Sequence, residues 1–284
     1  MTFEQWASQQ FADGEHTFRE LPLDLLHPLR HGPFAVTCTV AGGVITDCRF
    51  DVSHAHRGDE RLLEVRDLRQ GLALVNRHSW LTAAFAETLY ARIAESMLGL
   101  QVPARALALR QLSMALNSEA TNALWNYLDA SLIGDASDGL VRRDHALVEW
   151  ETLTGARMHP TYVRIGGVAH DIDAVQLDRL HNDDNPEIAE AARHVAATDG
   201  PIHTALPKVV RLPHGEQYAE IETPHGVLGM WIISRGDKVP HRVHLRTAGF
   251  RSMADLEREA IGSSTAAFLM RLARTRLVLG EVAR

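Results

Sequence analysis

One uninterrupted helical stretch limits what this chain of 284 residues can fold into. It runs from Pro103, which suits the first turn of a helix, to Gly134, which suits a helix end, and no other glycine or proline lies between them. A helix this long is stable only when neighbouring elements bury its apolar face. Similar spacing predicts three further helical segments, over residues 56–77, about 79–99 and about 140–153. We expect Ser79 and Gly99 to cap the second of these, and a helical bundle over 57–155.

Shorter segments with alternating apolar residues predict strands before and after the bundle. Two β-rich runs flank Ala41-Gly42-Gly43, which is typical of a hairpin. Residues 161–165 alternate with strand period, and residues 216–250 predict three strands joined by turns at "PHG" and "RGDK". Helices are expected over 185–197 and 264–279. The expected fold class is α+β, a central helical bundle with small antiparallel β-sheets near both ends.

The same patterns divide the chain into two parts of unequal length. Residues 1–26 show little periodicity, and we expect a poorly organised N-terminal segment there. Residues 27–284 are expected to form a single domain. Within it, a hairpin (27–53) and the bundle (57–155) precede the strands, short helix, meander and final helix of 156–284.

Composition narrows the possible functions. The formal net charge of −7 argues against a nucleic-acid-binding protein. The first residues resemble no signal peptide and no apolar run is long enough to span a bilayer, so a cytoplasmic protein is expected. Cys38 and Cys48 lie on either side of the predicted hairpin turn. A free pair of core thiols is favoured there over a disulfide, although both remain possible.

Few residues suggest chemistry on their own. His27 and His31 lie in a loop, "HPLRHG", where a ligand contact and a plain surface histidine are both possible. His54 and His56 form an H-x-H pair, but no third ligand follows, so no metal site is predicted. Arg157 and Arg164 flank a short strand that ends in Gly166-Gly167, which predicts either a ligand or partner surface or a purely structural turn. Glycine-rich nucleotide motifs and C-x-x-C pairs are absent from the sequence.

Several segments, taken together, resemble one known family. "LTGARMHPTYVRIGGV" resembles the Y-x-R-I-G-G-V motif of the 49-kDa (D-type) subunit of NADH–quinone oxidoreductase, respiratory complex I. The other matching segments follow in the same order as in that family: "HPLRHG", "SHAHRGDERLLEVRDLRQGL", "GLQVPARALALRQL", "GEQYAEIETPHGVLGMW" and "GEVAR". The family is related to the large subunit of nickel–iron hydrogenases. A nickel–iron site needs two C-x-x-C motifs, and this chain has neither.

The resemblance implies a site shared with another subunit. His31 matches the family's quinone-binding histidine, which can also supply a proton. Trp80 stands at the family's quinone-binding tyrosine, and Leu132 at the aspartate that pairs with the histidine. Arg77 matches an arginine near the iron–sulfur cluster, and the partner-facing set is expected to be Arg77, Arg157, Arg164, Gly166 and Gly167. The family's Glu-Leu pair in the long helix is Ala115-Leu116 here, and the segment between Gly167 and Gly215 is much shorter than in the family.

The resemblance also implies partners and cofactors. We expect a small iron–sulfur subunit of the B type and a C-type subunit, with the iron–sulfur cluster in the partner and the quinone at the shared interface. This chain is expected to bind no cofactor itself, to act as an NADH:quinone oxidoreductase only within the assembly, and to lie on the cytoplasmic face of the membrane through its partners. Two alternatives stay open: a non-catalytic scaffold on the same fold, and a component of a hydrogenase-related energy-converting complex without the nickel–iron site.

Overall fold

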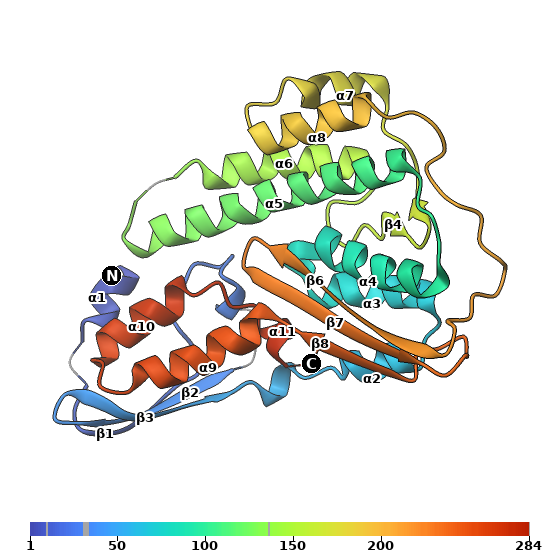
Figure 1. The fold of residues 1–284 in the computed structure, drawn as a ribbon. Coiled ribbons are helices and arrows are strands. Elements are labelled where there is room, and N and C mark those ends of the chain that lie inside the picture. The colour runs from blue at the N-terminus through green and yellow to red at the C-terminus, as the bar shows by residue number, and fades with distance from the viewer. Residues whose placement is uncertain (10, 31–33, 136, 284) are drawn as a thin grey trace. The chain divides into compact units, whose positions relative to one another are not determined.

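A computed structural model describes residues 1–9, 11–30, 34–135 and 137–283. Contacts between residues separate the chain into two compact units. Unit 1 comprises Met1–Arg57, Leu124–Leu140 and Thr247–Arg284, so it contains both ends of the chain (Figure 1). Unit 2 comprises Gly58–Ala123 and Val141–Arg246. The boundary expected at residue 26 lies within unit 1 and matches none of the four points at which the chain passes between the units.

Unit 1 contains a three-stranded antiparallel sheet in the order β1-β2-β3, formed by β1 (Gly14–Phe18), β2 (Ala35–Ala41) and β3 (Val44–Asp51). The predicted hairpin is confirmed: Gly42 and Gly43 turn the chain with φ of 61° and 78°, left-handed values that favour glycine. Strand β1 and the short helix α1 (Phe3–Ala7) fall in the segment expected to be poorly organised. That expectation was wrong for these residues, because both elements pack apolar side chains, such as Phe3 and Phe18, into the core of unit 1.

The C-terminal residues supply the helices of unit 1: α9 (Ala248–Ala260), α10 (Thr265–Arg274) and α11 (Leu279–Val282). The side chain of Ser264 caps α10, which ends before the predicted residue 279. Sequence periodicity did not predict α9. These helices bury Leu256, Phe268 and Leu272 in the same cluster as the inner side chains of β2 and β3. Short 3-10 turns lie at Pro28–Arg30 and Ser53–Ala55.

The helices expected as a bundle are α2 (Asp59–Glu64), α3 (Leu68–His78), α4 (Ala83–Leu98), α5 (Ala104–Leu132) and α6 (Gly139–Thr154). The segment expected as one helix over 56–77 is two, because Asp67 caps α3 with its side chain and starts a new helix. Gly99 ends α4 in the left-handed conformation, as predicted. Ser79 does not cap α4. A 3-10 turn over Trp80–Thr82 intervenes, and Thr82 is the N-cap residue.

The remaining elements of unit 2 are short helices and antiparallel strands. Helices α7 (Ala174–His181) and α8 (Pro186–Ala196) follow the two-stranded hairpin of β4 (Val163–Arg164) and β5 (Gly167–Val168). The predicted meander is confirmed as β6 (Gly215–Thr223), β7 (Gly226–Ser234) and β8 (Arg242–Arg246), with β7 in the centre. Helix α4 contacts β6 and β7 and contributes its apolar residues to their shared core.

The observed fold is therefore α+β, with helices and small antiparallel sheets, as the sequence predicted. Within the described ranges, no helix has the length and apolar character that a membrane crossing requires. In unit 2, the ends of α3 and α4 and the segment between α6 and α7 bring together most of the predicted site residues.

Candidate functional site

Most of the predicted site residues lie in unit 2. His31, the predicted catalytic histidine, falls outside the described residues. Arg77 lies in the last turn of α3 and Trp80 in the 3-10 turn that follows it, whereas Arg157, Arg164, Gly166 and Gly167 lie in the segment after α6. Two buried carboxylates of α4 contact this segment, Glu87 and Glu95, and Glu87 also joins it to the end of α3. The sequence analysis identified neither of them.

The end of α3 presents one cation and one indole ring. Arg77 is exposed and donates hydrogen bonds to the carbonyl of Ala73 at 2.8 Å and to Oδ1 of Asn76 at 3.1 Å. Trp80 is partly exposed in the 3-10 turn that separates α3 from α4. An indole N–H can only donate a hydrogen bond, so Trp80 lacks the acceptor and acid functions of a tyrosine hydroxyl.

An ionisable pair lies beneath this turn. Nδ1 of His78 is 2.7 Å from Oδ2 of Asp59, and both side chains are buried. The pair joins the first residue of α2 to the last residue of α3, where a histidine also suits the negative end of the helix dipole. Sequence spacing did not reveal this contact, because Asp59 and His78 belong to different helices.

The segment after α6 contains Arg157, whose positive charge is balanced by carboxylates of the same unit. Gly155 has φ of 80° and directly follows the last residue of α6. Arg157 forms ion pairs with Asp144 and, at 3.8 Å, with Glu151. Both carboxylates belong to α6, so the structure gives Arg157 a local role at this helix end.

Two residues of the next segment adopt an unusual backbone conformation. His159 has φ of 56° and Thr161 has φ of 47°. Left-handed values are uncommon for residues other than glycine, and they are costly for a β-branched residue such as threonine. The predicted strand over 161–165 is correspondingly short and comprises only Val163 and Arg164. The phenol ring of Tyr162 is buried, and its hydroxyl donates to the carbonyl of His170 at 3.0 Å.

Glu87 of α4 lies directly under this segment and is fully buried, with 0% of its surface exposed. Its carboxyl group accepts hydrogen bonds from Nδ2 of Asn76 at 2.8 Å and from the backbone N–H of Val163 at 3.0 Å. Burial raises the pKa of Glu87 to about 7, although the hydrogen bonds and the charge of Arg164 act in the opposite direction. The site thus contains a carboxyl group that changes its charge near neutral pH.

A second buried carboxylate fixes the glycine turn that follows. Glu95 and Arg110 form an ion pair with N–O distances of 2.6 and 3.0 Å, and Arg110 also donates to the carbonyls of Arg164 and Gly167. Oε1 of Glu95 accepts from the backbone N–H of Gly166 at 2.7 Å. The pair therefore satisfies both sides of the turn, as a buried ion pair must if its desolvation cost is to be offset.

The glycine pair itself packs against its own unit. Gly166 has φ of 89°, and a Cβ atom on Gly167 would lie 2.1 Å from the carbonyl oxygen of Ile202. Backbone hydrogen bonds join Gly166 to Thr204 and Val168 to Ile202. The close backbone approach of the two glycines is therefore made to residues 202–204. Of the two alternatives for these glycines, a ligand or partner surface and a purely structural turn, this contact favours the structural turn.

Arg77 and Arg164 are the exposed cations of this region. Each adjoins a residue that donates to Glu87, namely Asn76 for Arg77 and Val163 for Arg164. In the part of the chain that the structure describes, the guanidinium of Arg164 forms no ion pair. We refer to Asn76, Arg77, Glu87, Thr161, Val163 and Arg164 as the Glu87 corner.

The cysteines do not fit a nickel–iron site. Cys38 and Cys48 face one another on β2 and β3 of unit 1, buried and unoxidised, with 3.8 Å between their sulfur atoms. Two thiols inside a small sheet cannot supply the four thiolates of such a centre. Across the described ranges, no three histidine, cysteine, aspartate or glutamate side chains gather as a potential metal site, and His54 and His56 are exposed.

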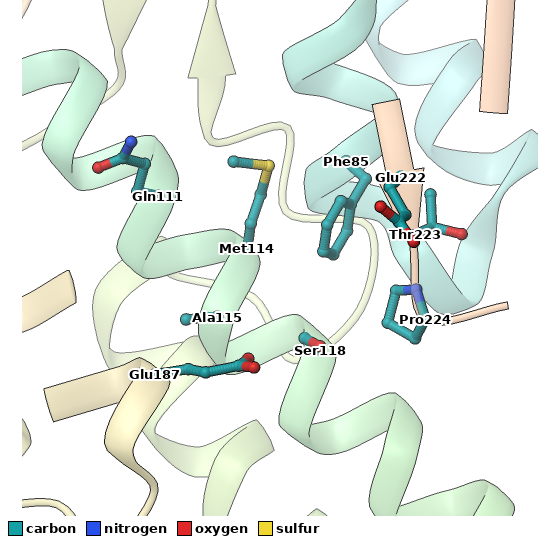
Figure 2. Close-up of a pocket in the computed structure, with 9 residues that line it drawn as sticks. All are labelled: Phe85, Gln111, Met114, Ala115, Ser118, Glu187, Glu222, Thr223 and Pro224. Atoms are coloured by element: carbon teal, nitrogen blue, oxygen red, sulfur yellow. The ribbon is translucent and has the colours of Figure 1, made fainter. Parts of the chain in front are cut away.

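Unit 2 also contains an open hollow of about 440 Å³ between α4, α5, α8 and the β6–β7 turn (Figure 2). Phe85 and Met114 form its apolar wall, and Glu187 and Glu222 supply carboxylates. Ala115, which stands where the family resemblance implies a glutamate, also lines it. Among the described residues of the predicted site, none belongs to this lining.

Comparisons with known proteins show which family the chain resembles. The sequence model of the family described as "Respiratory-chain NADH dehydrogenase, 49 Kd subunit" matches residues 137–185 and 192–284, half of the chain. The second of the D-type subunits of NADH-quinone oxidoreductase in Streptomyces griseus is 25% identical over 366 residues, covering 94% of this chain and 93% of that protein. The D-type subunit of Carboxydothermus hydrogenoformans is 25% identical over 349 residues, covering 90% and 96%.

A solved structure has the same fold. A chain of the membrane-bound sulfane sulfur reductase, an archaeal respiratory membrane complex, superposes with a TM-score of 0.78 at 18% identity, covering 96% of this chain and 98% of that one. The matched family segment contains the Arg157–Gly167 region, with its strained backbone and its glycine turn. The chain therefore belongs to the family of the 49-kDa subunit of respiratory-chain NADH dehydrogenase.

Proposed function

We propose that this chain is the 49-kDa (D-type) component of a complex I-type NADH–quinone oxidoreductase and that it forms a quinone-reduction site together with an iron–sulfur partner subunit. The observation that carries this proposal is the extent of the similarity. A relative named as a D-type subunit aligns along 94% of this chain and 93% of its own length, so the likeness is not confined to one motif. The 49-kDa family match supports the same assignment.

In this proposal, His31 hydrogen bonds a quinone carbonyl and supplies one of the two protons that reduction to the quinol requires. Trp80 offers the headgroup an indole N–H, a donor that cannot release a proton. The two electrons come from an iron–sulfur cluster in the partner, because a cluster needs about four thiolate ligands and this chain has two cysteines, paired inside a sheet.

The Glu87 corner supplies the partner-facing surface. Arg77 and Arg164 are exposed, and positive charge beside a reduced cluster stabilises the added electron. The proposed partners are a small iron–sulfur protein of the B type and a C-type subunit. They attach this chain to the cytoplasmic face of the membrane, and NADH is oxidised elsewhere in the assembly.

Two substitutions favour a second candidate, a non-catalytic scaffold on the same fold. Trp80 replaces a tyrosine that can donate a proton, and Leu132, which replaces an aspartate, is buried in an apolar cluster of unit 1. A scaffold keeps its partner contacts but loses the dependence of quinone chemistry on His31. The two candidates therefore differ in one measurable property.

The first test is purification of the tagged full chain from its native membranes in mild detergent, with mass spectrometry of the proteins that accompany it. We expect a small iron–sulfur protein and a C-type subunit in stoichiometric amounts. Recovery of the chain alone would contradict the proposal. Partners that include antiporter-like membrane subunits without NADH-oxidising subunits would instead indicate a hydrogenase-related complex.

The second test compares His31→Ala with His56→Ala in the purified complex, because His56 is an exposed histidine outside the proposed site. We expect His31→Ala to lower quinone reductase activity at least tenfold while the partners still co-purify, and His56→Ala to have no effect. Unchanged activity in both variants would favour the scaffold.

A further inference from the structure

Residues 159–164, which we call the strap, cover the carboxyl group of Glu87. The strap donates the backbone N–H of Val163 to this carboxyl at 3.0 Å, and Asn76 of α3 donates a second hydrogen bond at 2.8 Å. With 0% of Glu87 exposed, water reaches the carboxyl only if one of the segments that cover it moves, and the strap is one of these.

The donors to Glu87 are all uncharged. The charged or ionisable groups that reach it do so indirectly: Arg164 of β4 acts through space, Arg77 donates to Oδ1 of Asn76, and Nδ1 of His159 lies 3.3 Å from the carbonyl of Asn76. Glu95 differs, because its carboxylate is paired with Arg110. A buried carboxylate without a paired cation is costly, so the closed strap favours the protonated form of Glu87.

The strap also stores conformational energy. His159 and Thr161 both have left-handed φ values, and each such residue other than glycine costs free energy that only surrounding contacts can maintain. Movement of the strap relieves this strain and hydrates the carboxyl group at the same time. The strain favours opening whatever the charge of Glu87, whereas hydration favours it more strongly once the carboxyl is ionised and outweighs the hydrogen bonds lost on opening.

We propose that the strap is a proton-controlled cover: it is closed over Glu87 when the carboxyl carries its proton, and it opens when the carboxyl ionises. The inference concerns the chain alone and does not depend on the proposed function.

The direction follows from linkage. Burial raises the pKa of Glu87 to about 7 in the closed form, whereas the hydrated carboxyl titrates near its ordinary value of 4.5. Raising the pH from about 4.5 to about 7 therefore favours the open strap progressively, and above about 7 the effect levels off.

The closed, protonated form needs an acceptor for the carboxyl proton. A half-turn of the Asn76 amide supplies one, because it exchanges Nδ2 for Oδ1 at Glu87. The same turn directs Nδ2 toward Arg77 and breaks the 3.1 Å hydrogen bond from Arg77 to Asn76. Protonation of a buried carboxyl is thus transmitted to an exposed cation. If Arg77 and Arg164 face a partner, a partner that binds the closed form of the strap favours the protonated form of Glu87. Binding of that partner is then accompanied by uptake of a proton from solution.

The test is residue-resolved amide hydrogen exchange of the full chain between pH 5 and 8.5, with each rate divided by its intrinsic rate at that pH. We expect the opening constant of the Val163 amide to rise roughly sixtyfold from pH 5 to 7.5 and then to level off. The Leu112 amide of α5 should remain far better protected throughout, which shows that the opening is local.

Glu87→Gln should remove this rise, and Glu222→Gln, an exposed carboxyl on β6, should retain it. A wild-type opening constant that is flat from pH 5 to 7.5 would overturn the proposal, as would a rise that persists in folded Glu87→Gln. If Glu87→Gln does not fold, the wild-type profile together with a ¹³C titration of the Glu87 carboxyl decides, and a midpoint near 4.5 overturns it.

Discussion

Arg110 and Glu95 form a fully buried, bidentate ion pair whose members also bind both sides of the turn at 164–167. The pair ties α4 and α5 to this turn, so the position of Arg164 depends on two residues far from it in the sequence.

Removing one member of this pair should destabilise unit 2 strongly. Arg110→Met leaves a buried carboxylate without its cation, and we expect a loss of about 3–5 kcal/mol in the free energy of unfolding, measured by urea denaturation. Arg179→Ala, which removes the exposed partner of Glu149, is the matched control and should cost less than about 1 kcal/mol. Similar losses in the two variants would show that the buried pair contributes no more to stability than an exposed ion pair does.

Gly167→Ala should be costly, because its Cβ atom would lie 2.1 Å from a backbone carbonyl oxygen that cannot move aside. We expect a loss of about 2–3 kcal/mol in thermal or chemical unfolding. At Gly229 the nearest atom is the hydroxyl of Tyr218, at 2.6 Å, on a side chain that can rotate away. Gly229→Ala should therefore cost clearly less, and equal costs would contradict the close approach at Gly167.

The free energy of unfolding of the whole chain should depend on pH because of Glu87. Its pKa in the folded state is raised to about 7, so its contribution to stability is fully present below about pH 4.5 and is lost as the pH rises through 7. Over that window the difference in unfolding free energy between wild type and Glu87→Gln should fall by on the order of 3 kcal/mol. A difference that does not change with pH would show that Glu87 is already ionised in the folded chain.

Arg164 and Arg157 should differ in their effect on partner binding. Arg157 is paired with Asp144 and Glu151, whereas Arg164 is exposed and forms no ion pair among the described side chains. Arg164→Glu should reduce recovery of the iron–sulfur partner in pull-downs at least tenfold, and Arg157→Glu should reduce it less. The reverse order would place the partner surface at the end of α6.

The thiol count should distinguish the two states left open for the cysteines. Cys38 and Cys48 are buried and unoxidised, so Ellman's reagent should titrate neither within minutes in the native chain and both in denaturant. Absence of free thiols after denaturation without reductant would indicate a disulfide instead.

The sequence revealed the elements that proline and glycine delimit. Pro103 and Gly134 bracket α5, Pro186 starts α8, and Gly42-Gly43 turns the first hairpin. It failed where distant contacts decide the conformation. Strand β1 exists because β2 pairs with it, and β4 stops short because Thr161 is held in a left-handed conformation over Glu87.

The same distinction between local sequence signals and distant contacts applies to the candidate site. The family motif located Arg77, Arg157, Arg164 and the glycine pair, all of which lie in unit 2. The motif did not indicate Glu87, Glu95 or Arg110, whose partners are distant in sequence. The available signal was two carboxyl groups on the mostly apolar helix α4, where an unpaired buried charge is too costly to keep.

Unit 1 joins the first and last parts of the chain, and Ile45 of β3 exchanges backbone hydrogen bonds with Gly262 and Ser263, between α9 and α10. During translation the β2–β3 hairpin is therefore complete long before the helices that cover it exist. At typical ribosome speeds the wait is on the order of 10 to 40 seconds. Throughout that time the inner side chains of the hairpin have no native cover, so this sheet reaches its native burial only when the last part of the chain has been made.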